Sequence, residues 1–166
     1  SLHHEASKMN PDFTVFPETA LPSYLTKDYR TRKMLQETVN AYDIPLLTGT
    51  IDVKIKNKSK NYYNSAMWIT PNDDYQIYSK IHLVPFAEYD LFPGVFHPLT
   101  WLNINIDRGS FKSGDDYKIF NWRNISFSDL ICYESSMPGI VREFVSKGSE
   151  LLIIQANDAY LGNSYG

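Results

Sequence analysis

Apolar residues fall in short runs separated by polar turns along the first half of the chain. The run at residues 12–16 ends at Pro17, which is typical of a buried strand that stops at a loop. Residues 27–42 place large apolar side chains near helical spacing with charges between them, so they predict an amphipathic helix. Further strands are predicted at residues 45–51, 62–70 and 75–80.

The second half opens with an irregular stretch, residues 85–115, which is interrupted by several prolines and glycines. Loops of this length are usually functional or disordered. Residues 116–122 and 124–131 follow and predict a hairpin-like pair of strands.

The last part of the chain predicts a helix followed by a strand. Pro138 suits the first position of a helix that runs to Lys147, and Gly148 suits its end. Residues 151–154 form a continuous apolar run, which predicts a strand covered on both faces. Strand–helix–strand order at both ends of the chain indicates the α/β class.

Composition narrows the function classes. The 166 residues are 43% hydrophobic and 14% aromatic, which argues against disorder, and the net charge of −3 gives no basic footprint for nucleic acid. The densest basic stretch holds Lys54, Lys56, Lys58 and Lys60. It is interpreted as an exposed hairpin tip or loop, with a phosphate or lipid-headgroup patch as the alternative.

A single cysteine excludes an internal disulfide and any metal site built mainly from thiolates. The histidines offer no ligand spacing beyond the adjacent His3 and His4, so neither a metal nor another cofactor is expected. No apolar run approaches the ~20 residues that span a bilayer, and no signal peptide is visible, so the chain as it stands is expected to be soluble.

Three segments place a reactive side chain where a predicted strand ends: Glu18 within 16–22, Lys80 within 78–89 and Cys132 within 129–134. The carboxyl ends of strands form the ligand crevice of layered α/β folds, so these side chains are candidates to converge. A thiolate attacks acyl carbon, a carboxylate takes the thiol proton, and an ammonium with a backbone N–H stabilises the resulting oxyanion. Taken singly, each residue also has an ordinary structural explanation.

The three segments together resemble the glutamate, lysine and cysteine motifs of the nitrilase (carbon–nitrogen hydrolase) superfamily, in the same chain order. More narrowly, FPETALP at 16–22, LVPFAEY at 83–89, ICYE at 131–134 and NDAYLG at 157–162 resemble the apolipoprotein N-acyltransferase family. The resemblance runs over nearly the whole chain from Pro11. Ala87 departs from it, because the family commonly has glycine there.

The resemblance implies an αββα sandwich, incomplete here, so residues 1–166 are interpreted as one partial domain that lacks the family's flanking transmembrane segments. It implies transfer of an acyl chain from a phospholipid to the diacylglyceryl-cysteine of an apolipoprotein, at the periplasmic face of a bacterial inner membrane. By position, Cys132 is the nucleophile, Glu18 the general base and Lys80 the oxyanion-side lysine. Glu88 matches the second active-site glutamate, and Tyr133 and Glu134 match pocket residues beside the nucleophile.

Alternatives remain at this point. A soluble amidase or nitrilase would use water in place of the lipoprotein amine, and a catalytically inactive fragment would only bind or assemble. The apolar residues between Leu91 and Leu102 suit acyl chains or a membrane surface, or else a loop that packs its own aromatics. The family strands that are missing from the chain would leave sheet edges uncovered, which raises the prospect of self-association.

Overall fold

The structure is a computed structural model that describes residues 2–21, 23–56, 58–72, 74–85, 88 and 111–157. Its first sheet has the order β1-β2-β3-β4, with β1 (Thr14–Val15) parallel to β2 (Leu46–Lys56). The strands β3 (Ser59–Thr70) and β4 (Asp74–Ser79) continue it as antiparallel neighbours. The four strands predicted in this half are confirmed, and β2 runs further along the chain than predicted.

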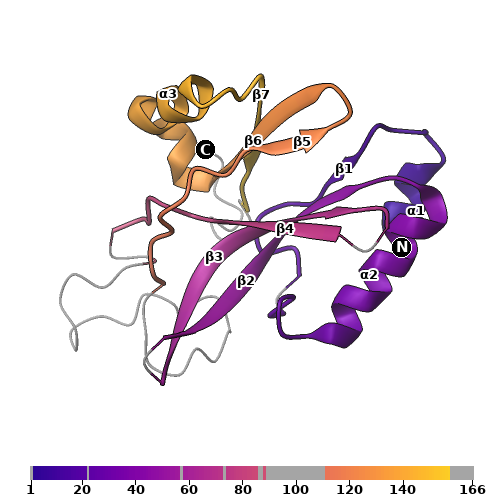
Figure 1. The fold of residues 1–166 in the computed structure, drawn as a ribbon, viewed down its shortest axis with the longest axis horizontal. Helices are drawn as coiled ribbons and strands as arrows, with labels where there is room; N and C mark the ends of the chain where they lie inside the picture. Colours follow the sequence, from indigo (N-terminus) through magenta and orange to yellow (C-terminus); the bar gives the residue numbers. More distant parts are fainter. Residues whose placement is uncertain are drawn as a thin grey trace, which may run out of the picture.

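The second sheet has the order β5-β6-β7 and lies above the first in Figure 1. The predicted hairpin is confirmed by the antiparallel pair β5 (Phe120–Trp122) and β6 (Ile125–Ile131), although β5 is shorter than expected. The strand β7 (Leu151–Gln155) runs parallel to β6. The prediction that this strand is covered on both faces is wrong: Ile154 is 58% exposed and Leu151 40% exposed, because β7 is the edge strand of the described sheet.

Helices lie outside the sheets. Of these, α1 (Leu2–Ser7) was not predicted, whereas α2 (Tyr29–Tyr42) and α3 (Pro138–Ser146) were. The Asp28 side chain caps α2 by accepting a hydrogen bond from the Thr31 backbone at 3.1 Å. Gly148 follows α3 with φ +99°, a conformation that favours glycine, as its predicted role as a helix end requires. None of the described helices combines the length and apolar character needed to cross a bilayer.

Two apolar clusters hold the layers together. The larger one fills the space between the sheets, where Trp68 of β3 packs edge-on against Phe127 of β6 with ring centroids 4.9 Å apart. The other packs Leu35 and Val39 of α2 against the outer face of the first sheet. The helices and stacked sheets form the predicted α/β sandwich in partial form (Figure 1).

The lysine-rich segment forms the tip of the β2–β3 hairpin, as predicted, with Lys54, Lys56, Lys58 and Lys60 exposed. The apolar residues from Leu91 to Leu102, for which an acyl-chain or membrane contact was considered, lie outside the described part of the chain.

Candidate active site

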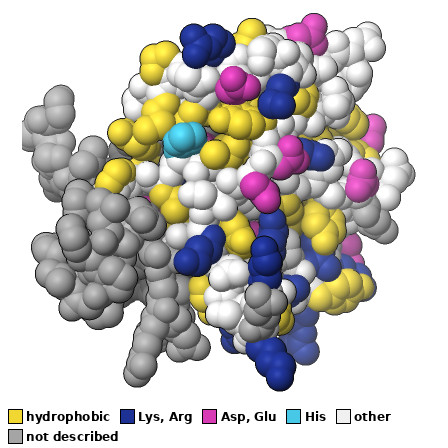
Figure 2. Space-filling view, turned by 60° about the vertical axis from the view of Figure 1, so that its left-hand side comes forward, with side chains coloured by type: hydrophobic (Ala, Val, Ile, Leu, Met, Phe, Trp, Pro, Cys, Tyr) yellow, Lys and Arg dark blue, Asp and Glu magenta, His cyan; other side chains and the backbone are white. Residues whose placement is uncertain are grey.

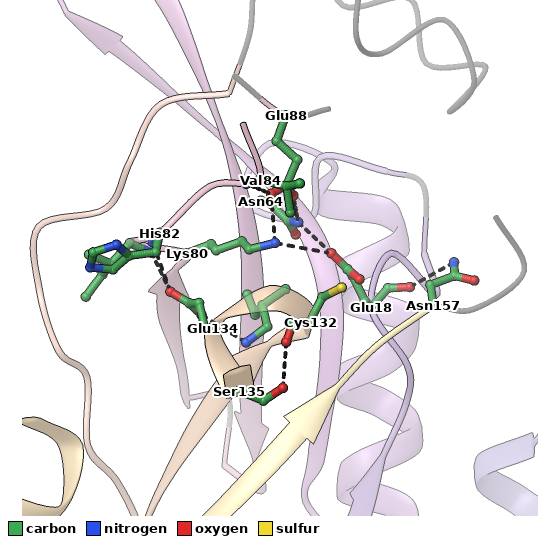
Figure 3. A network of polar contacts seen from close by, with 12 residues as sticks. Glu18, Asn64, Lys80, His82, Val84, Glu88, Cys132, Glu134, Ser135 and Asn157 are labelled. Carbon is green, nitrogen blue, oxygen red and sulfur yellow. Dashed lines mark hydrogen bonds and ion pairs between the residues drawn. The ribbon is translucent and has the colours of Figure 1, made fainter. Parts of the chain in front are cut away.

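Three strand ends place the predicted reactive side chains next to one another (Figure 3). Glu18 follows β1, Lys80 follows β4 and Cys132 follows β6 directly. Lys80 Nζ lies 4.0 Å from Glu18 Oε1, and the Cys132 side chain lies close enough to the Glu18 carboxyl to lower its pKa slightly, against the larger effect of burial. The structure therefore brings together three residues that are separated by more than 50 positions along the chain.

The segment that carries Glu18 rests directly on β2. A Cβ atom at Gly49 would stand 2.4 Å from the Thr19 nitrogen and 2.8 Å from the Glu18 Cα, so only glycine allows this approach. The end of β7 holds the same segment from the other side, because Gln155 Nε2 donates to the Phe16 carbonyl at 2.6 Å. The backbone of the Glu18 segment is thus fixed by both sheets.

Lys80 is almost fully buried, with 1% of its side chain exposed, and its ammonium is paired. Nζ lies 2.7 Å from Glu88 Oε2, which also accepts a hydrogen bond from the Val84 backbone at 2.9 Å. A buried ammonium needs such a partner, because removing it from water costs on the order of several kcal/mol. The Lys80 ammonium is therefore held between the carboxyl groups of Glu88 and Glu18.

Asn64 on β3 is a member of the site that the sequence reasoning missed. Its Nδ2 donates to Glu18 Oε1 at 2.7 Å and to Glu88 Oε1 at 2.6 Å, so one amide joins the two carboxylates. The signal was present in the strand pattern: Asn64 alternates with Ala66 and Trp68, which face the core between the sheets. A polar side chain on a buried strand face requires a partner.

The nucleophile candidate sits at a sharp change of backbone direction. Cys132 is half-buried and has φ 53°, an uncommon value for a residue that is not glycine. It ends β6 and begins the short 3-10 helix η2 (Cys132–Ser136), and the Tyr133 backbone N–H lowers the pKa of its thiol against the larger effect of burial. Strained backbone of this kind clusters at functional sites.

Burial shifts the pKa values of both the base candidate and the nucleophile candidate upward. Burial raises the pKa of Glu18, while the hydrogen bond from Asn64 and the charge of Lys80 oppose that rise. Burial also raises the pKa of the Cys132 thiol, and the negative charge of Glu18 adds to the effect. A carboxylate with a raised pKa beside a protonated thiol is suited to take that proton during attack.

Glu134 is completely buried and ties the lysine segment to the nucleophile turn. Its Oε1 accepts hydrogen bonds from the Tyr78 hydroxyl at 2.7 Å and from the Ile81 and His82 backbones at 2.8 and 3.1 Å. Its Oε2 accepts from the Ile131 backbone at 2.9 Å. Glu134 thus fixes the residues that follow Lys80 against the turn that presents Cys132.

Tyr133, the other predicted pocket residue, lies beside the nucleophile and is 38% exposed. His82 contributes its backbone N–H to the Glu134 contacts. Within the described ranges, no group of three histidine, cysteine or acidic side chains is arranged to hold a metal ion.

Solved structures support the fold. A carbon–nitrogen hydrolase from Helicobacter pylori superposes with a TM-score of 0.68 at 17% identity, covering 93% of this chain and 51% of that one. An amidase from Nesterenkonia sp. superposes with a TM-score of 0.64 at 15% identity, covering 97% of this chain and 59% of that one. At these identities the likeness establishes the architecture alone.

Curated relatives are more similar in sequence. Apolipoprotein N-acyltransferase 1 of Treponema pallidum is 32% identical over 90% of this chain and 31% of its own length. The apolipoprotein N-acyltransferase of Aquifex aeolicus is 28% identical over 99% of this chain and 35% of its own length. The chain spans about a third of the length of these relatives. The carbon–nitrogen hydrolase family model matches residues 1–166, and the chain belongs to that family.

Proposed function

We propose that this chain carries the catalytic centre of an apolipoprotein N-acyltransferase. It would move an acyl chain from a phospholipid to the N-terminal amine of an apolipoprotein through a thioester on Cys132. The observation that carries the proposal is the convergence of Glu18, Lys80 and Cys132, in a chain whose relatives bear that name over 90% or more of its length. We place the enzyme at the periplasmic face of a bacterial inner membrane, held there by segments outside this chain.

In the first half-reaction, Glu18 takes the proton of the Cys132 thiol as sulphur attacks the ester carbonyl of the phospholipid. The carbonyl oxygen becomes an oxyanion, which Lys80 and the Tyr133 N–H stabilise. The intermediate collapses by breaking the bond to the glycerol oxygen. That oxygen leaves as the lysophospholipid hydroxyl and receives its proton from Glu18, so the enzyme is left as a thioester with Glu18 ionised.

In the second half-reaction, the apolipoprotein amine attacks the thioester carbonyl while Glu18 takes an amine proton. The oxyanion forms in the same place, and its collapse breaks the carbon–sulphur bond. The proton on Glu18 returns to the sulphur, which yields the amide and the free thiol. A hydrolase of the same family would put water in the place of the amine.

The neighbouring polar residues act in this scheme as positioning residues. Glu88 holds Lys80 in place and directed at the oxyanion, since its Oε2 lies 2.7 Å from Nζ. Glu134 holds the lysine segment and the nucleophile turn at a constant separation through its four hydrogen bonds. Tyr133 contributes its backbone N–H and lines the approach to the thiol.

The thioester provides the direct test. The full-length protein incubated with phospholipid alone should gain the mass of one acyl group, removable by hydroxylamine, because no amine is present to resolve it. Cys132→Ala should abolish the adduct. Glu18→Gln should slow its formation roughly 10²–10⁴-fold, the contribution of a positioned base. Glu143→Gln, an exposed acidic residue on α3, is the matched control and should leave the rate unchanged.

The second half-reaction separates the transferase from a hydrolase. Addition of a diacylglyceryl-cysteine peptide should discharge the thioester and yield the N-acyl peptide. Discharge at the same rate by water alone would favour an amidase-type hydrolase. An undiminished adduct in Cys132→Ala would place the nucleophile elsewhere and overturn the proposal. A full-length protein that never becomes acylated would favour the alternative of a catalytically inactive chain.

A further inference from the structure

The tip of the β2–β3 hairpin concentrates positive charge on a chain that is acidic overall. We call residues 53–61 the lysine hairpin; it comprises the ends of β2 and β3 and the turn between them. Its four lysines are all exposed, and the sequence has no aspartate or glutamate from residue 53 to residue 72. Figure 2 shows Lys and Arg side chains gathered at the lower end of the molecule, where Figure 1 places this hairpin.

Little of this charge is neutralised locally. Asp52, at the base of the hairpin, lies 4.0 Å from the Lys54 ammonium. Asp115 is the other acidic group near the base of the hairpin. Burial raises the pKa of Tyr63 most, and the charge of Asp115 raises it further. In the part of the chain that the structure describes, no carboxylate forms an ion pair with Lys56, Lys58 or Lys60.

An aliphatic side chain stands among the lysines. Ile55 is 68% exposed and pairs across the hairpin with Lys60. It lies on the same strand face as Val53 and Tyr62, which are buried at the base of the hairpin. Exposed aliphatic residues flanked by lysines combine apolar contact with attraction to anionic headgroups, the combination that interfacial membrane binders use.

The hairpin extends the two central strands of the first sheet, at the end of the sheet where Glu18 and Lys80 lie. The end of β4 pairs Ser79 with Ser65, and beyond it the Lys80 and Lys112 backbones bond to Asn64 and Tyr62, so residues 59–61 of β3 extend past these contacts. At ~3.3 Å per residue this is a projection of about 10 Å. Because Lys80 follows β4 and Glu18 follows the parallel strand β1, a flat surface that met the hairpin tip would face the site.

We propose that the lysine hairpin docks on the anionic headgroups of a lipid bilayer and inserts Ile55 between them. The inference extends the proposed function, in which the acyl donor is a phospholipid, by assigning this chain its own membrane contact. A free phosphate would not need the aliphatic side chain. Lysines spread along an extended hairpin form a contact surface, not a pocket for a small anion.

Vesicle flotation of the 166-residue chain tests the docking. The chain should float with phosphatidylcholine vesicles that contain phosphatidylglycerol, and float less with phosphatidylcholine alone or in high salt. Replacing the four hairpin lysines by glutamine should lower partitioning on the order of 10²–10³-fold, since each lysine near an anionic surface contributes roughly fivefold. The matched control carries the same charge change elsewhere, at Lys8, Lys27, Lys33 and Lys147, and should keep most of the binding.

Two single variants complete the design. Ile55→Ser leaves the charge unchanged and should weaken binding several-fold. Cys132→Ala should bind vesicles like the parent chain, which separates failure of the docking from failure of the proposed chemistry. Absence of vesicle binding, equal losses in the two lysine variants, indifference to phosphatidylglycerol, or full binding by Ile55→Ser would each overturn the proposal. Circular dichroism of every variant confirms that it is folded.

Discussion

The molecule buries carboxyl groups in two contrasting ways. At the site, Glu18 and Glu88 are both buried, and both accept hydrogen bonds from Asn64 while Lys80 stands between them. Asp129 lies on β6, three residues before Cys132, and is also completely buried. Neither of its carboxyl oxygens has a hydrogen-bond partner among the described residues.

The difference shows two physical solutions to the same desolvation cost. The site glutamates are surrounded by donors and a cation, which makes a buried negative charge tolerable. Asp129 has no such donor or cation among the described residues, and burial, with the nearby charges of Glu134 and Glu18, raises its pKa well above the ordinary value. Glu134 belongs to the first kind, because four donors surround it.

The largest effect is expected from removing the Lys80 ammonium, which lies between Glu18 and Glu88. Lys80→Met leaves Glu18 and Glu88 buried without their ammonium, so unfolding should become easier by about 3–5 kcal/mol. Thioester formation should slow by about 10²–10³-fold, the cost of losing an oxyanion partner. Denaturant unfolding and intact-mass kinetics measure the two effects. Adding Glu88→Gln to Lys80→Met should recover part of the stability and none of the rate, whereas an unchanged acylation rate in Lys80→Met would contradict its role.

An intermediate effect of opposite sign is expected at Asp129. Asp129→Val replaces an unpaired buried carboxyl by an apolar side chain suited to a strand, and should stabilise the protein by about 1–3 kcal/mol near neutral pH. The pKa of Asp129 is higher in the folded chain than in the unfolded chain. Above pH ~3.8 the unfolded chain therefore binds fewer protons than the folded one. The stability of the wild type consequently falls as the pH rises toward the folded-state pKa. The gain in the variant should therefore grow with pH, by up to about 1.4 kcal/mol per unit.

Urea unfolding of the wild type and Asp129→Val across a pH series provides that measurement. Asp116→Val, at an exposed position, is the control and should change stability by no more than about 0.5 kcal/mol. If Asp129→Val were destabilised equally at all pH values, the Asp129 carboxyl would have a structural partner. The contrast between Asp129 and the paired glutamates of the site would then not hold.

The smallest effect concerns the amide that joins the site glutamates. Asn64→Leu removes a hydrogen bond that lowers the pKa of Glu18 against the larger effect of burial, so the pKa should rise further. In the proposed mechanism acylation requires ionised Glu18, so the acidic limb of its pH profile should move to higher pH. The rate on that limb should fall about tenfold, the value of one hydrogen bond to a charged group. Asn61→Leu on the same strand is the control, and a uniform loss at all pH values would indicate a purely structural role.

The strand ends were predictable because they depend on local pattern. The apolar run before Pro17 located Glu18, and the run before Cys132 located the nucleophile candidate. The lysine alternation from Lys54 to Lys60 likewise indicated an exposed hairpin tip, since each charged side chain needs water. The apolar run at residues 151–154 gave the wrong prediction of a strand covered on both faces. A strand at the edge of a sheet can have the same composition as a central one.

The sequence by itself determined which reactive residues stand at strand ends and which family motifs they match. Only the tertiary structure decided their partners. Asn64 lies 46 positions from Glu18, and Glu134 lies 56 positions from Tyr78, yet each pair is in hydrogen-bond contact. Within the described ranges, the same packing leaves the Asp129 carboxyl without a hydrogen-bond partner and forces the Glu18 segment onto Gly49. Hydrogen bonds act over about 3 Å, so they follow from how the two sheets stack, and local pattern carries no record of that distance.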